Sequence, residues 1–413
     1  MERAISVILL LTLSWTAFGK TWLVSPNGPQ TSIKQTLSMA GPGDTILVSH
    51  GTYREKGLVI TRPVFLKGID TPVLDGENKF EIIAVKASHV TIEGFRLTGS
   101  GTSGWNDIAA IKIYAQRNVT IRNNRLEHTF FGIFCQNAVQ CLITGNRLSS
   151  DANNEIQSGN GIHCWHCDSM RIERNDITGH RDGIYFEFVT HSLIRGNRSF
   201  DNVRYGLHFM FSHEDSYIDN TFRRNAAGVS VMFSHGVTML GNTFTENWGG
   251  GAYGILMKEI TDSRVQGNRF LDNTIGIYME GTTRIYVINN LFSGNGYALK
   301  IQASCSSDTI THNNFTGNTF DIATNGSLVL NNFDGNYWDK YEGYDLDRNG
   351  IGDVPYHPVS LYSMIAEKNP TVMMLFHSFM VSLLDRTEKI MPGITPENLK
   401  DDRPFIKQLN LRP

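Results

Sequence analysis

The sequence predicts an all-β fold, a right-handed parallel β-helix in which coils of about 22 residues stack into a solenoid. The first observation is composition, because 413 residues include 39 Gly but only 19% charged side chains, too few for the solvated faces of a helix-rich fold. The second is a repeat of nearly constant length. The third is alternation of apolar residues between Gly and Asn corners, which is typical of short strands. A net charge of −3 gives no reason to expect a nucleic-acid partner.

The repeat is marked by an Asn that opens a short apolar segment. Its copies are Asn146, Asn175, Asn197, Asn220, Asn242, Asn268, Asn290 and Asn313. Successive copies are 29, 22, 23, 22, 26, 22 and 23 residues apart. The Leu-x-x-Leu-x-Leu frame of a leucine-rich repeat is absent. We expect the Asn of each coil to bond its side-chain amide to the Asn of the next coil, forming an internal ladder.

The chain is expected to begin with a signal peptide at residues 1–19. Arg3 precedes an apolar run over Ala4–Phe18, and the small residues Ala17 and Gly19 stand three and one positions before the expected cleavage site. The run is shorter than the ~20 residues that cross a bilayer, which favours cleavage over an uncleaved anchor. The mature protein is therefore expected to be exported.

The β-helix itself is predicted over residues 20–338. A short helix over Ser32–Ala40 is expected to cover its first coils, because a terminal coil has no neighbour on one side. Extra residues fall between the Asn motif and the next Gly strand at Gly99–Asp107, Ser149–Gly159 and Trp248–Gly251. These insertions are expected along one corner of the solenoid, where solenoids form binding rims.

Residues at equal distance from the Gly of each coil are expected to form columns on the outer face. The first outward column contains Phe134, His163, Tyr185, His208, Ser230, Leu256 and Tyr278. The second contains Gln136, Trp165, Glu187, Met210, Met232, Lys258 and Glu280. Two exposed methionines are thus expected one above the other, beside an exposed histidine, His208.

The same two coils repeat the tetrapeptide Met-Phe-Ser-His, so its histidines are also expected to stack. Thioether and imidazole suit Cu(I), a soft ion, in a compartment where thiols oxidise. The sequence therefore predicts a copper site formed from His208, Met210, Met232, His213 and His235. Alternation alone points His213 inward, so it faces the metal only if the strand turns a corner by Ser212. The alternative is that the methionines belong to the core and the histidines to the corners.

A second group of candidate metal ligands lies within one coil. His163, His166 and Cys167 are the residues that could bind a second ion. Cys164 takes an inward position above Cys135 of the preceding coil, which is also explained by a stacked buried pair or a disulfide across coils. Five cysteines are an odd number, so at least one is unpaired unless it bonds to a partner or a metal.

An enzyme acting on acidic sugars would need a compact set of carboxylates and bases on the outer face. Glu187, Lys258 and Glu280 are instead spread along one column. Asp182 and Arg181 precede a strand and are expected at a corner. The sequence therefore favours a protein that is not an enzyme, and a polysaccharide lyase or epimerase is the alternative.

Residues 339–369 are predicted to form a loop segment. Oxygen-bearing side chains alternate up to Gly350, as in the first half of a calcium loop, and Tyr356 stands where the full loop has Glu. The candidate Ca²⁺ ligands are Asp345, Asp347, Asn349 and Asp353. An ordinary Asp/Gly turn is the alternative.

Residues 370–413 are predicted to form a C-terminal helix and an extended arm for docking. Pro370 suits a first helical turn, and the apolar run Val372–Leu384 is too short to span a bilayer. His377 and two serines interrupt the run, which indicates an amphipathic helix. It could pack on its own solenoid or on a partner.

Several distinctive strings run through the chain, at Gly179–Phe188, Arg204–Ser212, Val231–Ser234, Asn247-Trp248, Tyr253-Gly254, Asn336–Trp338 and Gly350–Tyr356. Together they resemble the NosD family of periplasmic copper-binding accessory proteins of nitrous oxide reductase maturation. The resemblance implies a non-catalytic role with an ABC transporter permease and ATPase, a copper chaperone lipoprotein and nitrous oxide reductase, with membrane contact through the permease. The alternative role is a metal-free structural adaptor of a transporter.

Overall fold

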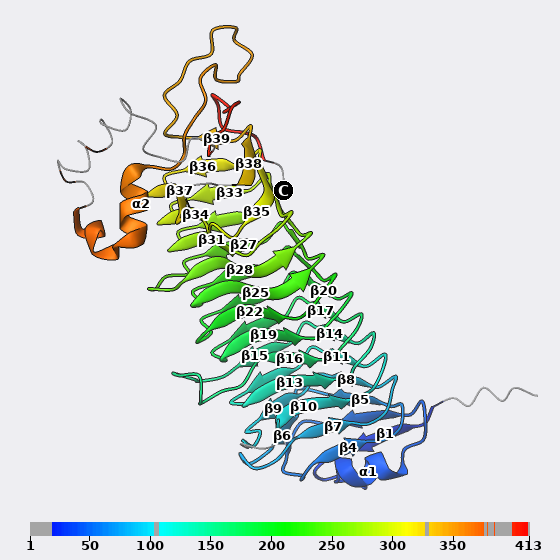
Figure 1. Cartoon of the computed structure of the whole chain (residues 1–413). Coiled ribbons are helices and arrows are strands. Elements are labelled where there is room, and N and C mark those ends of the chain that lie inside the picture. The colour runs from blue at the N-terminus through cyan, green and yellow to red at the C-terminus, as the bar shows by residue number, and fades with distance from the viewer. Residues whose placement is uncertain are drawn as a thin grey trace, which may run out of the picture.

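The computed structural model describes residues 19–102, 107–326, 330–375, 378, 384 and 399–411, and here the predicted parallel β-helix is confirmed. The described strands form three parallel sheets of 14, 12 and 13 strands, one strand of each sheet recurring in most coils. Figure 1 shows the elongated stack, with α1 at one end and β39 near the other. The predicted signal peptide lies outside the described residues except for Gly19.

The strand bounds show how short each wall of a coil is. The 14-strand sheet contains β1 (Thr21–Val24), β2 (Thr45–Val48), β5 (Phe65–Gly68), β8 (Thr91–Glu93), β11 (Thr120–Arg122), β14 (Leu142–Thr144), β17 (Arg171–Glu173), β20 (Leu193–Arg195), β23 (Ser216–Ile218), β26 (Thr238–Leu240), β29 (Arg264–Gln266), β32 (Tyr286–Ile288), β35 (Ser306–Thr311) and β38 (Leu330–Asp334). The 12-strand sheet contains β4 (Leu58–Ile60), β7 (Ile83–Val85), β10 (Ala109–Tyr114), β13 (Phe131–Gln136), β16 (Ile162–Trp165), β19 (Asp182–Glu187), β22 (Tyr205–Met210), β25 (Ala227–His235), β28 (Tyr253–Thr261), β31 (Ile275–Glu280), β34 (Tyr297–Ile301) and β37 (Phe320–Thr324). The 13-strand sheet contains β3 (Thr52–Tyr53), β6 (Val73–Asp75), β9 (Arg96–Thr98), β12 (Arg125–Glu127), β15 (Arg147–Ser149), β18 (Asp176–Thr178), β21 (Arg198–Phe200), β24 (Thr221–Arg223), β27 (Thr243–Thr245), β30 (Arg269–Leu271), β33 (Leu291–Ser293), β36 (Asn314–Thr316) and β39 (Tyr337–Trp338).

The core is a set of columns that run along the solenoid. In the 13-strand sheet the inward rings stack with centroids 4.1 to 5.4 Å apart, and they are Phe222, Phe244, Phe270, Phe292, Phe315 and Trp338. All six side chains are buried. Each coil therefore packs chiefly on the coils before and after it, which is the physics of a solenoid.

The predicted Asn ladder is present inside the solenoid. Asn220 donates from its backbone N–H and from Nδ2 to Asn242 Oδ1, both at 2.9 Å, and its Nδ2 also donates to the Ile194 carbonyl. A second ladder was not predicted, although each of its members stands five residues after a member of the first. It contains Asn202, Asn225, Asn247, Asn273, Asn295 and Asn318. Asn residues thus occupy two corners of most coils.

The N-terminal end is covered as predicted. Helix α1 (Ile33–Met39) begins after Ser32, whose hydroxyl accepts a hydrogen bond from the Gln35 N–H. Ile33 and Leu37 are buried against the first strands. The helix closes the core where no preceding coil could do so.

The C-terminal end is closed by part of the segment predicted as a docking arm. Residues 399–411 lie on the last coil, and Phe405 donates its N–H to the Asn336 carbonyl. Asp401 is buried and accepts hydrogen bonds from the backbone and side-chain nitrogens of Asn336, so it ends the first ladder. Over this stretch the arm predicted for docking packs on its own solenoid, because the exposed acceptors and donors of a terminal coil need partners.

The region between the last strand and the arm contains helices. Helix α2 (Leu361–Lys368) begins after Ser360 and lies within the segment predicted as a loop. Tyr362 of α2 packs on Phe320 of β37. The 3-10 helix η1 (Pro370–Leu375) follows, and most of the predicted amphipathic run lies outside the described residues. Within the described ranges, no helix is long and apolar enough to cross a membrane.

Buried carboxyl groups inside the solenoid make its stability depend on pH. Asp215 is completely buried; its Oδ1 accepts the Ser192 N–H, and Oδ2 has no hydrogen-bond partner among the described residues. Burial raises the pKa of Asp215 to about 8, and burial also raises the pKa of Asp321 to about 6. Both groups are therefore protonated in the folded protein under mildly acidic conditions.

Substituting Asp215→Asn is expected to flatten the pH dependence of stability. Between the ordinary pKa of 3.8 and the folded-state value of about 8, the folded state holds one proton more than the unfolded state. The free energy of unfolding then falls by about 1.4 kcal/mol for each unit that the pH rises, and the variant loses this slope. Urea unfolding at pH 5 and pH 7 measures the difference. Asp219→Asn, at an exposed corner four residues later, is the control, and identical slopes in wild type and Asp215→Asn would contradict the prediction.

Candidate metal centre

The outer face of the 12-strand sheet holds the predicted methionine pair. Met210 of β22 and Met232 of β25 are in-register partners on adjacent coils. Both side chains are half-buried, whereas the preceding Phe209 and Val231 are completely buried. The methionines therefore lie on the outer face and are not misregistered core residues. Their Cα atoms stand about 4.8 Å apart, the spacing of neighbouring strands.

The hydroxyl group of Tyr185 contacts one sulfur atom of this pair. Tyr185 stands one coil earlier, and its hydroxyl lies 3.9 Å from Met210 Sδ as a hydrogen-bond donor. Burial raises the pKa of Tyr185 to about 12, so the phenol remains protonated at neutral pH. The contact orients one thioether while leaving the other without this constraint.

His208 lies on the same face two residues before Met210, but it is buried and not exposed as expected. Its side chain is only 6% exposed. The rings of Tyr185 and Tyr205 each lie 4.9 Å from the imidazole, edge to face. Neither ring nitrogen has a hydrogen-bond partner in the described part of the chain. The alternation correctly predicts the outward direction of His208, but neighbouring tyrosines cover it.

His213 and His235 stack as predicted, on the far side of a corner from the methionines. Phe211 has a φ of 49° and Phe233 a φ of 54°, so the chain turns before Ser212. The two imidazole centroids are 4.2 Å apart and nearly parallel. Burial and the nearby His235 lower the pKa of His213. The predicted five-residue set is therefore divided into a methionine pair with one buried histidine and a separate histidine pair.

An aromatic ladder that was not predicted from the sequence occupies this corner. His166, Phe188, Phe211 and Phe233 stack with centroids 4.6, 5.3 and 5.1 Å apart. Phe188 and Phe233 are 41% and 38% exposed. The phenylalanines of this ladder have a left-handed backbone, which is unusual for bulky residues. The signal in the sequence was an aromatic residue directly after the second outward column in consecutive coils.

The second group of candidate ligands is not brought together. His163 lies between the rings of Phe134 and Tyr185, and burial together with nearby Arg181 lowers its pKa to about 3. His166 is exposed at the corner, and Cys167 is buried with its Sγ donating to the Cys135 carbonyl. The Cys167 thiol therefore faces the interior of the solenoid, whereas the rings of His163 and His166 lie on the outer face.

The thiols are all enclosed. In the described residues the five cysteines are buried and unpaired, and Cys135 and Cys164 stand in register on adjacent coils. No group of three or more His, Cys, Asp or Glu side chains within the described ranges is placed to hold a metal ion. The sulfur atoms that face outward beside one another are therefore the two thioethers.

The carboxylates of the candidate calcium loop already accept hydrogen bonds from donors within the loop. Asp345 accepts the N–H groups of Asn349 and Gly350, at 3.1 and 2.9 Å. Asp347 accepts from the Asn349 side chain, and Asp353 accepts the Leu346 N–H. This pattern is that of an Asp/Gly turn, and calcium would have to replace these bonds.

A compact set of charged groups does exist, contrary to the expectation from sequence. Asp182 is completely buried at the start of β19 and is bound by Arg204 through two hydrogen bonds of 2.9 and 2.6 Å. His208 Nδ1 lies 3.8 Å from Asp182 Oδ2. The sequence placed Asp182 at a corner and gave no sign of this pairing, because its partners come from the next coil.

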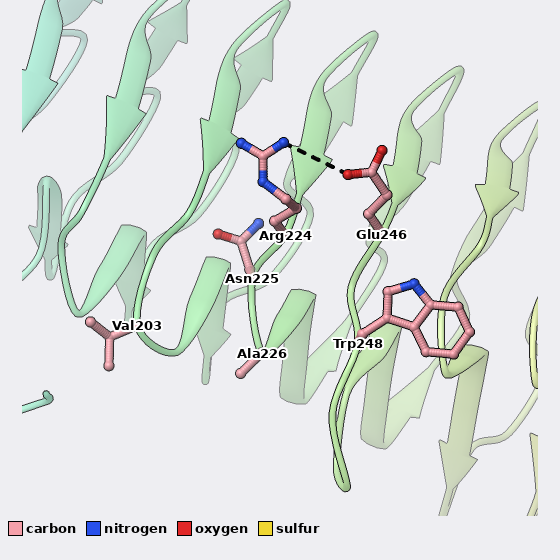
Figure 2. A pocket seen from close by; sticks show the side chains of 6 residues that line it. All are labelled: Val203, Arg224, Asn225, Ala226, Glu246 and Trp248. Atoms are coloured by element: carbon pink, nitrogen blue, oxygen red, sulfur yellow. Dashed lines mark ion pairs between the residues drawn. The ribbon is translucent and has the colours of Figure 1, made fainter. Parts of the chain in front are cut away.

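The insertion corner carries a surface pocket of about 500 Å³ (Figure 2). Its lining residues are Val203, Arg224, Asn225, Ala226, Glu246 and Trp248. Arg224 Nη1 lies 3.7 Å from Glu246 Oε2, and Trp248 is 57% exposed beside them. The insertion at Trp248–Gly251 therefore forms one wall of a surface recess, as expected for a rim.

Comparisons with known proteins give consistent matches. A family model described as "Periplasmic copper-binding protein (NosD)" matches residues 149–343. The chain is 30% identical over 396 residues to the "Probable ABC transporter binding protein NosD" of Pseudomonas aeruginosa, covering 84% of this chain and 85% of that protein. It is 28% identical over 369 residues to the protein of the same name from Stutzerimonas stutzeri, covering 84% of each.

Among solved structures, PfbA, a surface adhesin of Streptococcus pneumoniae, resembles the chain with a TM-score of 0.57. The two sequences are 11% identical, and the match covers 70% of this chain and 86% of PfbA. At this identity the likeness concerns the fold alone. The curated relatives, by contrast, are named as binding proteins and not as enzymes.

Proposed function

Because the chain belongs to the NosD family, we propose that it is a periplasmic protein that carries Cu(I) on the outer face of its solenoid. Copper is its cargo, supplied for nitrous oxide reductase maturation. Its partners are the permease and ATPase of an ABC transporter, a copper chaperone lipoprotein and the reductase. Export through a cleaved signal peptide brings it to the periplasm, and contact with the permease brings it to the inner membrane.

The observation that carries this proposal is the methionine pair. Met210 and Met232 present two thioethers on adjacent coils, and thioethers are soft ligands that select Cu(I). The thiols, which would compete for the ion, are buried. His208 is the imidazole on the same strand face, and His213 with His235 forms a second pair beyond the corner. In this proposal the sulfur atoms of Met210 and Met232 bind the ion, and one of these imidazoles is the further ligand.

The decisive experiment is a competition titration against a Cu(I)-binding chromophore. The double variant Met210→Leu/Met232→Leu is expected to bind Cu(I) roughly 100-fold more weakly than the wild type, which is about 2.8 kcal/mol. Leu preserves the size of the side chain while removing the sulfur. The affinity is measured for both proteins at the same chromophore concentration.

A matched control is available in the same sheet. Met257 and Met279 also stand in register on adjacent coils, but both are completely buried. The double variant Met257→Leu/Met279→Leu is expected to keep the wild-type affinity. Unchanged affinity in Met210→Leu/Met232→Leu would refute the methionine site, and a loss confined to His213→Ala/His235→Ala would move the site beyond the corner.

A further inference from the structure

Three cationic or imidazole side chains converge on one carboxylate oxygen of the outer face. Asp182 Oδ2 accepts a 2.6 Å hydrogen bond from Arg204 Nη2. Arg181 Nε and His208 Nδ1 each lie 3.8 Å from the same oxygen. One buried carboxylate therefore shares its oxygen among two guanidinium groups and an imidazole.

The polar atoms around this carboxylate are incompletely hydrogen-bonded. Arg181 Nε, both ring nitrogens of His208 and Ser230 Oγ are buried and lack a hydrogen-bond partner within the described ranges. Ser230 follows His208 in the same outward column. Buried polar groups in native proteins are normally paired. Three residues with such groups on successive coils of one sheet indicate a site that takes oxygen acceptors from a bound molecule.

The cluster is exposed to solvent at its two arginines. The side chains of Arg181 and Arg204 are 30% and 27% exposed. Arg204 is already engaged by Asp182 and also lies 3.7 Å from Glu155, which belongs to the insertion that projects between β15 and β16 (Figure 1). Arg181 donates through Nη2 to Asn160 Oδ1 and keeps Nε unbonded. Arg181 is therefore the cation available to a ligand.

We infer that Arg181 and Ser230, together with Nδ1 of His208, form a binding site for a carboxylate-bearing molecule, which adjoins the proposed copper site and shares His208 with it. A guanidinium donates to a carboxylate in a planar, charge-assisted pair, and Arg181 is the partly exposed guanidinium here that is not already held by two hydrogen bonds to Asp182. The rings of Tyr185 and Tyr205 border the site and contact the ligand's carbon skeleton. An acidic sugar and a small organic acid share this chemistry, and the experiment distinguishes them.

Isothermal titration calorimetry of the wild-type protein with D-galacturonate, D-galactose and citrate tests the inference. Saturable binding of galacturonate without binding of galactose is expected, because only the acid carries the carboxylate. Binding of galacturonate alone identifies an acidic sugar as the source, and binding of citrate with equal affinity identifies small organic acids. The variant Arg181→Gln is expected to weaken the binding at least about tenfold.

The control is Arg174→Gln, whose exposed side chain lies at another corner beside Glu173. It is expected to keep wild-type binding. Arg181→Gln should also keep its Cu(I) affinity, so that failure of this site and failure of the copper proposal are distinguishable. The inference is overturned if no carboxylate binds, if galactose binds as well as galacturonate, or if Arg174→Gln loses binding equally.

Discussion

Replacing Asp401 by alanine is expected to lower the free energy of unfolding by about 3–5 kcal/mol, because several buried donors lose their acceptor together. Asp401 Oδ1 accepts the N–H groups of Gly335 and Arg403, at 2.9 and 3.1 Å. Asp401 Oδ2 accepts the Asn336 N–H, the Asn336 side-chain amide and the Trp338 indole, at 2.8, 3.1 and 3.0 Å. The carboxylate and Trp338 are both buried, so water cannot replace these bonds.

Urea unfolding followed by tryptophan fluorescence measures this effect, since the Trp338 indole donates a hydrogen bond to the carboxylate. Asp402→Ala is the matched control, because Asp402 is the next residue, is exposed and, within the described residues, forms an ion pair with the partly exposed Lys400. An exposed pair of this kind contributes about 0–1 kcal/mol. Asp401→Asn keeps one acceptor oxygen and should fall between the two. Equal stability of Asp401→Ala and Asp402→Ala would show that the C-terminal segment does not close the solenoid.

Asn242→Ala is expected to cost about 3–4 kcal/mol, although it lies in the middle of the solenoid and not at its end. Asn242 Oδ1 accepts the backbone and side-chain N–H groups of Asn220. Asn242 Nδ2 donates to the Tyr217 carbonyl and to Asn268 Oδ1, at 2.9 and 3.0 Å. Alanine leaves the donors of Asn220 and the acceptor oxygens unpaired inside a dry core.

The same substitution also breaks the coupling between two halves of the stack. Each coil is stabilised chiefly by its neighbours, so loss of one ladder rung weakens the interface between the coils that it joined. Amide hydrogen exchange is expected to rise most at the coils on either side of Asn242. Thr243→Ala, which removes a half-buried outward side chain from the next position, is the control and should change the unfolding free energy by less than about 1 kcal/mol. Equal effects of the two substitutions would contradict the ladder's contribution.

The prediction of the solenoid succeeded because its signals are local and repeated. A 22- or 23-residue spacing, a Gly before each strand and an Asn after it define the coil length, and stacking in register then follows. Equal spacing within successive coils places Met210 next to Met232 and His213 next to His235 for the same reason. The second Asn ladder was not predicted, although its signal is equally regular, five residues downstream of the first.

Features that depend on contacts between different coils could not be predicted in this way. His208 points outward as the alternation requires, yet it is buried because Tyr185 and Tyr205 cover it. Asp182 and Arg204 pair across coils, which the spacing of either residue within its own coil does not indicate. The position of Asp401 on the ladder depends on a chain return over more than sixty residues, and no local pattern marks it.

The sequence by itself therefore determined the β-helix, its outward columns and the adjacency of the two methionines, because a repeat of constant length brings equivalent residues together without any knowledge of side-chain packing. Only the tertiary structure decided which outward residues are buried and which charges meet. It also decided that Phe211 and Phe233 turn the chain between the methionine and histidine pairs, and that the C-terminal segment closes the solenoid. Those outcomes depend on side-chain volumes and on hydrogen-bonding groups supplied by neighbouring coils or by distant parts of the chain. The local repeat pattern predicts neither the volumes that meet nor the groups that pair.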